Sequence, residues 1–199
     1  MDRAQLPELH YITHLDNVAS ILKRGILSNA RSRRQNPTSV AMEEIQDRRS
    51  ARAIPGGGPL HSYACLYLHA RNAMLRKILV RHEELAVLRI APDTLDAPGA
   101  VIADGNASSD YTRFYPSPEG LQFLDSVLVF ARYWTSDNPY EYMHRKRVRM
   151  AELLVPEKVP PESITGAYVS CPEAQEMLLR VRFALPIAID HDFFFGKGA

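Results

Sequence analysis

The chain has little cysteine and no long apolar run, and both absences exclude whole classes of protein. Cys65 and Cys171 are too few for a disulfide scaffold, and no CxxC pair or zinc-ligand spacing occurs. The N-terminal stretch MDRAQLPELH lacks the apolar centre of a signal peptide. No stretch approaches the ~18 apolar residues that a membrane span requires. The sequence therefore predicts a soluble, cytoplasmic protein without membrane association.

Common catalytic signatures are missing as well. The glycine run at 56–58 lacks the GK[ST] ending of a phosphate loop, and neither GxSxG nor HExxH occurs. His10 and His14 are expected on a strand and a cap with no third ligand near, so no metal site is predicted. The remaining set is one strand acid, several arginines, aromatic rings and amide-rich loops. Such residues can stabilise a cation-like sugar transition state and bind a neighbouring pyrophosphate, and this chemistry requires no metal.

A length of 199 residues with 46% hydrophobic content predicts a single domain, 1–199, with an ordinary core. The net charge of +1 hides a clustering of cations. They form three groups: Arg31, Arg33 and Arg34; Arg48, Arg49 and Arg52; and Arg145, Lys146, Arg147 and Arg149. Each group alone reads as solvated surface, whereas together they suit a basic face for a polyanion.

Hydrophobic periodicity predicts many short strands and few helices. The strands are expected at residues 9–13, 60–69, 85–90, 100–103, 150–155, 164–169 and 187–189. Helices are expected after Asp16, at 40–52 with Met42 and Ile45 inward, at 72–82 and at 172–181, with 121–130 and 139–147 less regular. Residues 111–118 read as an aromatic loop. Because strands and helices do not alternate regularly, the expected fold class is α+β.

The most informative stretch is RKRVRMAELLV at 145–155, in which four cations lead into an apolar strand. With a period of two, Met150, Glu152 and Leu154 share one face. A buried glutamate is costly unless it is paired, hydrogen-bonded or used in chemistry. Two readings are open at this point: Glu152 is aimed into a site beside a cationic entry, or it faces water from an edge strand.

Five segments in order resemble the DarT family of DNA ADP-ribosyltransferase toxins. They are ITHLDNVASILKRGIL, IQDRRSARAIPGGGPLHSYACLYLHARNAML, ADGNASSDYTRF, RKRVRMAELLVPEKVPPESITGAYV and the aromatic tail. The resemblance implies the ADP-ribosyltransferase fold, with split antiparallel or mixed sheets flanked by helices. It also implies transfer of ADP-ribose from NAD to a base in single-stranded DNA, with thymine as the expected base. The partner that it implies is a macrodomain antitoxin.

The resemblance assigns catalytic roles to Glu152 and to the pair Arg48 and Arg49. Glu152 would hold the ribose hydroxyl and stabilise the oxocarbenium-like state as nicotinamide leaves. An arginine of the pair would pin the pyrophosphate or act on the N–H of the target base, and which of the two aligns is open. We expect Glu152→Ala to abolish transfer and to leave the fold intact.

Further residues are assigned to NAD and DNA by the same likeness. The residues assigned to NAD are Thr13, His14, Asn17, Arg48, Tyr67 and Asn72. The backbone near Thr13 and His14 would bind the carboxamide of nicotinamide, and Tyr67 would line the nicotinamide pocket. For DNA they are His61, Asn106, Arg113, Arg145, Lys146, Arg147 and Arg149. The plain alternatives are a capping histidine at 14, a core tyrosine at 67 and a turn asparagine at 106.

The chain departs from the family pattern at two places. His10 and Tyr11 stand in the reverse of the usual tyrosine-histidine order, which exchanges the side chain expected on the site face. Asn72 and Arg76 replace a serine and a tyrosine. Two alternatives to thymine transfer are kept: the same scaffold acting on guanine, RNA or protein, and an inactive module that binds NAD or nucleic acid. A monomer is the default oligomeric state.

Overall fold

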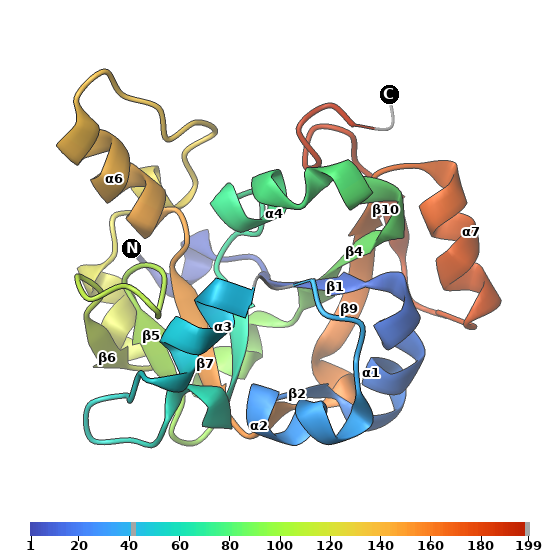
Figure 1. The fold of residues 1–199 in the computed structure, drawn as a ribbon, viewed down its shortest axis with the longest axis horizontal. Helices are drawn as coiled ribbons and strands as arrows, with labels where there is room; N and C mark the ends of the chain where they lie inside the picture. Colours follow the sequence, from blue (N-terminus) through green and yellow to red (C-terminus); the bar gives the residue numbers. More distant parts are fainter. Residues whose placement is uncertain (41–42, 198–199) are drawn as a thin grey trace.

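The computed structural model describes residues 1–40 and 43–197, and it has mixed α and β architecture (Figure 1). The strands are β1 Leu9–His14, β2 Ile26–Leu27, β3 Tyr63–Tyr67, β4 Leu85–Ile90, β5 Val101–Ala103, β6 Phe114–Pro116, β7 Glu152–Pro156, β8 Lys158–Val159, β9 Ile164–Val169 and β10 Ile187–Ile189. The α-helices are α1 Val18–Arg24, α2 Asn29–Ser32, α3 Glu43–Ser50, α4 Ala73–Lys77, α5 Ser126–Val129, α6 Pro139–Val148 and α7 Pro172–Arg180. Short 3₁₀ helices cover Arg3–Gln5, Leu15–Asn17, Arg33–Gln35, Leu60–Ser62, Leu79–Glu84, Pro92–Asp96, Glu119–Phe123 and Pro161–Ser163.

The main sheet has eight strands in the order β10-β9-β4-β1-β3-β7-β5-β6, and β2 pairs with β8 in a small second sheet. Its pairs are antiparallel except β9 with β10. Between β1 and β3 the ladder holds only one residue pair, His10 with Tyr67. The sheet is therefore nearly split into two halves at this point, which confirms the α+β fold with split sheets.

The split leaves one edge of β1 without a neighbouring strand. β1 is paired along its full length to β4, from Leu9 to His14. On its other side, residues 11–14 have no strand partner within the described part of the chain. Backbone N–H and C=O groups in such a position need another partner. They are open to a ligand that approaches between β1 and β3.

The β7 strand places Glu152 as the period-two pattern predicted. Leu153 and Val155 pack into the largest apolar cluster, whereas Leu154 belongs to a separate cluster with Ile54 and Ala103. Glu152 lies on the Leu154 side of the strand. It pairs in register with Tyr67 on β3 and Ala103 on β5, so it lies in the interior of the sheet rather than at an edge.

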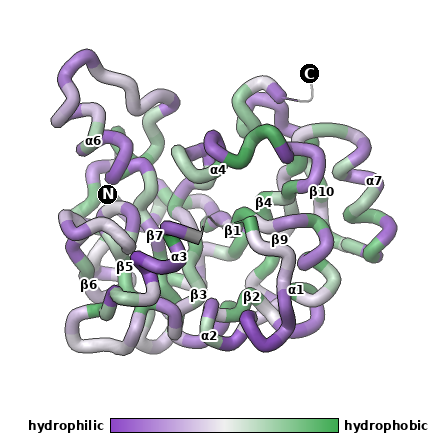
Figure 2. Tube along the Cα trace, viewed as in Figure 1, coloured by the Kyte–Doolittle hydropathy of each residue, from purple (hydrophilic) through white to green (hydrophobic). Residues whose placement is uncertain are grey.

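Helix α3 is hydrophilic over almost its whole length, as Figure 2 shows. Among residues 44–50 the buried side chain is that of Arg49. The amphipathic helix expected at 40–52 therefore has less of an apolar face than predicted, and Met42 lies outside the described residues. A polar contact of Arg49, described below, attaches this helix to the sheet.

Two other elements differ from the sequence-based expectation. The aromatic segment 111–118 contains β6, which pairs with β5 at the edge of the sheet, where a proline is tolerated. The helix expected at 72–82 ends at Lys77 because Ile78 leaves helical geometry, and a 3₁₀ segment follows. Within residues 1–40 and 43–197 the longest helix, α6, has ten residues and cannot traverse a bilayer.

Candidate active site

Glu152 lies at the base of a large cleft, with 1% of its surface exposed. Its Oε2 accepts a hydrogen bond from Nη2 of Arg49 at 2.9 Å, and its Oε1 accepts one from Nη1 of the same residue at 3.3 Å. The backbone N–H of Ala107 donates to Oε1 at 3.0 Å. A bidentate guanidinium and a backbone N–H fix the carboxylate and compensate its burial. The buried reading of Glu152 is therefore the one the structure supports.

The two adjacent arginines of α3 have different environments. Arg49 is 9% exposed and reaches Glu152, whereas Arg48 is exposed and donates to Glu44 one turn earlier, at 3.0 Å. Both side chains line the cleft. Successive helical residues point about 100° apart, so only one of them can face β7. Of the two arginines, Arg49 is the one positioned beside the acid.

Three further side chains of β1 and β3 line the cleft near Glu152. Nη2 of Arg49 also contacts Sγ of Cys65 at 2.8 Å, and burial raises the pKa of this thiol to about 11, so it is neutral. Burial, followed by the charge of Glu152, raises the pKa of Tyr67 far above its ordinary value. Burial raises the pKa of Tyr11 to about 12. The three side chains that line the cleft beside the ion pair of Arg49 and Glu152 are thus neutral, and two of them are aromatic.

The exchange of His10 and Tyr11 has a clear structural result. Tyr11 lines the cleft, and His10 lies outside it. The cleft face of β1 therefore carries a phenol where the family pattern places an imidazole. Cys65 is half-buried, lines the cleft and also packs against the apolar cluster of Leu154.

The cleft has a volume of about 1130 Å³, ample for a dinucleotide. Six cationic side chains and three acidic ones line it: Arg48, Arg49, Arg52, Lys77, Lys146 and Arg147, against Asp16, Asp110 and Glu152. Three buried polar atoms of described residues on its walls have no hydrogen-bond partner: Nε2 of His61, Nε of Arg52 and Oδ1 of Asn29. Burial, with the charges of Arg33 and Arg49, lowers the pKa of His61. The excess of cationic over acidic side chains fits an anionic ligand such as a pyrophosphate.

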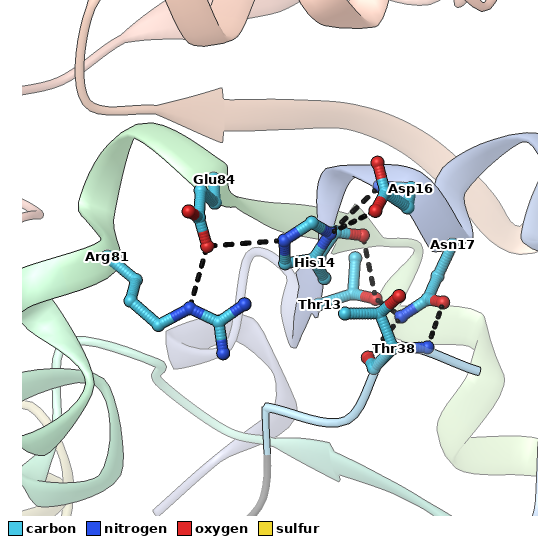
Figure 3. Close-up of polar contacts among 7 residues, drawn as sticks. All are labelled: Thr13, His14, Asp16, Asn17, Thr38, Arg81 and Glu84. Atoms are coloured by element: carbon cyan, nitrogen blue, oxygen red, sulfur yellow. Dashed lines mark hydrogen bonds and ion pairs between the residues drawn. The ribbon is translucent and has the colours of Figure 1, made fainter.

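At the β1 end of the cleft, Asn17 holds the opposite wall in place (Figure 3). Its Nδ2 donates to the carbonyl of Thr38 at 2.8 Å, and its Oδ1 accepts from the Thr38 N–H at 3.0 Å. Nδ2 also lies 3.3 Å from Oγ1 of Thr13. Asn17 and Thr13 both line the cleft. The Asn17 amide is thereby engaged with protein groups and supports the cleft wall.

His14 is used as a local structural residue rather than as a cleft side chain. Its Nδ1 accepts from the N–H of Asp16 at 3.2 Å, and its Nε2 lies 3.3 Å from Glu84, which also binds Arg81 (Figure 3). The ring is 7% exposed and does not line the cleft. Its side chain therefore has the capping role of the plain alternative.

For two residues that were predicted to contact ligands, burial in the structure indicates a structural role instead. Asn72 is fully buried, and its Oδ1 accepts from the N–H groups of Met74 and Leu75, so it caps α4 rather than binding NAD. Arg149 is 2% exposed, and its guanidinium donates to the carbonyls of Val129 and Ala131. A guanidinium engaged in this way is not available to a DNA phosphate.

The other predicted DNA contacts divide by position. Lys146 and Arg147 line the cleft, and Arg147 also binds Asp104 at 2.5 Å. Arg145 lies outside the cleft and pairs with Glu141 at 2.6 Å, while Arg113 is exposed and outside it as well. Of these four cationic residues, Lys146 and Arg147 are thus the two that line the cleft.

Asn106 faces the cleft but also builds its own turn. Its Oδ1 accepts from the N–H and from the hydroxyl of Ser108, at 3.0 and 2.8 Å. This turn brings the N–H of Ala107 to Glu152. The residue thus has the structural role of the plain alternative, and its turn positions one hydrogen-bond donor to the Glu152 carboxylate.

Two further residues that line the cleft were expected to contact DNA only as members of a larger group of cations or aromatic rings. Arg52 donates to Asp110 at 2.8 Å and to the carbonyl of Ser109 at 3.0 Å, which joins α3 to the 104–113 loop. Tyr111 is 85% exposed and lines the cleft. Both belong to segments that the sequence had marked, the second cationic group and the aromatic loop. The sequence did not show which residues of those segments would line the cleft.

Comparison with known proteins adds a second, independent line. A model of the family described as "ssDNA thymidine ADP-ribosyltransferase, DarT" matches residues 10–195. The chain belongs to the DarT family. The match spans nearly all of the described fold, including Glu152 and Arg49, and confirms the family resemblance of the sequence.

Two curated relatives and one solved structure show how similar this DarT-family chain is to proteins already described. It is 35% identical over 196 residues to a "DNA ADP-ribosyl transferase-DNA ADP-ribosyl glycohydrolase fusion protein" of Thermosipho africanus, covering 94% of this chain and 49% of the relative. The chain thus spans about half the length of that relative. It is 28% identical over 191 residues to a "DNA ADP-ribosyl transferase" of Thermus sp., covering 90% and 89%. The structure of Thermus sp. DarT in complex with ADP-ribosylated ssDNA superposes with a TM-score of 0.81 at 25% identity, covering 95% and 96%.

Proposed function

We propose that this chain is an NAD-dependent mono-ADP-ribosyltransferase that modifies a base, thymine, in single-stranded DNA. The observation that carries this proposal is the Glu152 carboxylate, buried at the base of a dinucleotide-sized cleft and fixed by Arg49 and the Ala107 N–H. Family membership and the Thermus relative in complex with ADP-ribosylated ssDNA support the choice of substrate. We treat residues 1–199 as one transferase domain.

Glu152 is the group that acts on the sugar of NAD. Cleavage of the bond between nicotinamide and ribose leaves positive charge on the sugar. A fixed carboxylate at that point accepts a ribose hydroxyl hydrogen bond and stabilises the developing cation. Because Arg49 and Ala107 hold the carboxylate before substrate binds, little reorganisation is required at the moment of reaction. The edge of β1 at residues 11–14 that faces away from β4 supplies hydrogen bonds for the nicotinamide carboxamide.

Arg49 lies close enough to Glu152 to serve the acceptor base in the same step. A guanidinium stays protonated and so cannot remove a proton itself. It can stabilise negative charge on a thymine ring as the ring N–H proton leaves to solvent. The base nitrogen then forms its bond to the ribose carbon from which nicotinamide departs. Arg49 would thus link the two halves of the reaction.

The cleft rim fits a single strand of nucleic acid. Lys146, Arg147 and Arg52 supply positive charge for the backbone, and the exposed ring of Tyr111 offers a stacking surface. A base that is not in a duplex reaches Glu152 without the cost of unpairing. The large, open cleft is consistent with a strand that enters beside NAD.

We infer that the protein is the toxin of a toxin–antitoxin pair whose antitoxin is a macrodomain that removes the modification. The fusion relative from Thermosipho africanus joins a DNA ADP-ribosyl transferase to a DNA ADP-ribosyl glycohydrolase in one chain, and this supports such a partner. An enzyme that consumes NAD and modifies DNA would act in the cytoplasm. A monomer remains the proposed state.

Incubation with labelled NAD and separate pools of single-stranded DNA, double-stranded DNA, RNA and protein tests the proposal. Label on single-stranded DNA, with mass spectrometry locating it on thymine, is the expected result. Glu152→Gln, which keeps the shape of the side chain and removes its charge, should abolish labelling. Label on RNA, on protein or on guanine would replace the proposed substrate, and no label in any pool would favour the inactive binding module.

A further inference from the structure

A second cavity, of about 340 Å³, lies at the other end of β1 from Thr13 and shares no lining residue with the cleft. Its walls come from the start of β1, the segment after β3, the residue after α5, strand β9 and the C-terminal tail. Those used below are Glu8, His10, His69, Phe130, Tyr168 and Phe193. The transfer reaction proposed above makes no use of these residues.

Aromatic rings build this cavity as an ordered stack. Phe193 lies between His69 and Tyr168, with ring centroids 5.2 and 4.9 Å away and interplanar angles of 9° and 16°. The Arg89 guanidinium covers the Tyr168 ring at 5.1 Å, and the edge of Phe130 meets His69. These rings pack on one another and form a rigid, largely apolar wall, against which a planar ring can lie.

His10, which lines this cavity, has a ring nitrogen without a hydrogen-bond partner. Its Nε2 lies 3.0 Å from Oε1 of Glu8. Burial alone would raise the pKa of Glu8, but hydrogen bonds from His10, Arg89 and Tyr168 lower it to about 2, so Glu8 is ionised and can only accept. In the neutral imidazole the proton therefore sits on Nε2. Nδ1 is then a bare acceptor on a ring that is 3% exposed, and it has no hydrogen-bond partner.

His69 contributes a hydrogen-bond donor to the cavity. Its Nδ1 accepts from the Arg71 N–H at 3.1 Å and from Nη2 of Arg149 at 3.0 Å. Burial and the charge of Arg149 lower the pKa of His69 to about 2, so the ring is neutral and carries its proton on Nε2. That N–H has no partner among the described residues. The rings of His10 and His69 are 5.3 Å apart, close enough for one guest ring to meet both.

We propose that this cavity is a second binding site, which takes a nucleobase through one acceptor, one donor and aromatic walls. Nucleobase edges carry a donor and an acceptor side by side, and their faces stack on aromatic rings. The base can come from a free nucleotide or from the DNA strand beyond the catalytic cleft. Both sources present the same ring. Binding here requires neither NAD cleavage nor Glu152.

Long-range ¹H–¹⁵N spectra of the histidine rings test the site, because they report the protonation and bonding of each ring nitrogen. The unaltered chain, without NAD, is titrated with adenosine monophosphate, with thymidine monophosphate and with a single-stranded oligonucleotide. His10→Gln assigns the His10 signals. The expected result is a shift of His10 Nδ1. Response to the nucleotides alone assigns the site to free nucleotides, and a response to the oligonucleotide at lower concentration assigns it to the DNA strand.

Two filling variants and one matched control complete the test. Phe130→Trp and Gln5→Trp narrow the cavity, Gln5 from an exposed position that leaves the core intact, and each should weaken the His10 response about tenfold or more. Phe123→Trp, on an exposed phenylalanine outside the cavity, should leave the response unchanged. A response at His61 in the cleft with none at His10 overturns this proposal while leaving the transferase proposal standing. A His10 shift that both filling variants leave unchanged overturns it as well.

Discussion

The buried ion pair between Arg49 and Glu152 predicts a specific pattern of stabilities. Removing one partner of a buried pair leaves an uncompensated charge and typically costs about 3–5 kcal/mol. Glu152 is 1% exposed, which places Arg49→Met in that range. Arg49 lines the open cleft and can turn toward water, so we expect Glu152→Ala to cost less, about 3 kcal/mol. The intact fold expected from sequence for Glu152→Ala is therefore revised to a folded but less stable one.

The double variant distinguishes this pair from two independent contacts. With Arg49→Met and Glu152→Gln combined, no buried charge remains, and we expect a total cost of about 1 kcal/mol or less. The coupling from the double-mutant cycle, which also uses Glu152→Gln alone, should then be at least about 3 kcal/mol. Urea unfolding followed by circular dichroism gives each free energy. Additive costs would refute the buried pair, as would a cost of a few tenths of a kcal/mol for either single variant.

Four further predictions concern catalysis, the KM for NAD, the pH dependence of stability and the salt dependence of DNA binding. Arg49→Ala should lower kcat at least about 100-fold while the matched Arg48→Ala changes it less than about threefold, measured with labelled NAD and a thymine-containing strand. Asn17→Ala releases two hydrogen bonds to the Thr38 backbone, so KM for NAD should rise about tenfold with a smaller change in kcat. The pKa of Glu8 is lowered from 4.5 to about 2, which stabilises the fold by up to about 3 kcal/mol above pH 4.5. This stabilisation is lost as the pH falls toward 2. In urea unfolding, Glu8→Gln should therefore be less stable than the unaltered chain at pH 7, and the two stabilities should converge near pH 2. Single-strand affinity should fall with salt at a log–log slope of about 0.7 per phosphate contacted, and a flat dependence would remove the basic rim from the account.

Local pattern was enough to predict the acid and the strands around it. The alternation across Met150–Leu154 placed Glu152 on one face of a strand, and the cost of burying it indicated a use. The structure confirms the burial and supplies the partners, Arg49 and Ala107. Both lie far away in the sequence. Their approach depends on how α3 and the 104–113 loop dock on the sheet, which no local period contains.

Other assignments depended on tertiary contacts that the sequence does not reveal. In the sequence Arg149 was assigned to a cationic run, but α6 ends at Val148 and the chain turns inward. There the carbonyls of Val129, at the end of α5, and of Ala131 accept hydrogen bonds from the guanidinium. The choice between Arg48 and Arg49 depended on the rotation of one helix. Asn72 is different, because an asparagine before Ala-Met-Leu is a local helix-capping signal that could have been recognised.

The central claim is that Glu152 acts on the ribose that carries nicotinamide, and a crystal structure of this chain with a non-reactive carbocyclic NAD analogue tests it most directly. We predict that the analogue fills the cleft, with its nicotinamide amide on the open backbone of residues 11–14. An oxygen of Glu152 should then lie within hydrogen-bonding distance of a hydroxyl on the nicotinamide-bearing ring. An analogue bound elsewhere, or one whose nicotinamide-bearing ring lies beyond the reach of Glu152, would contradict the account.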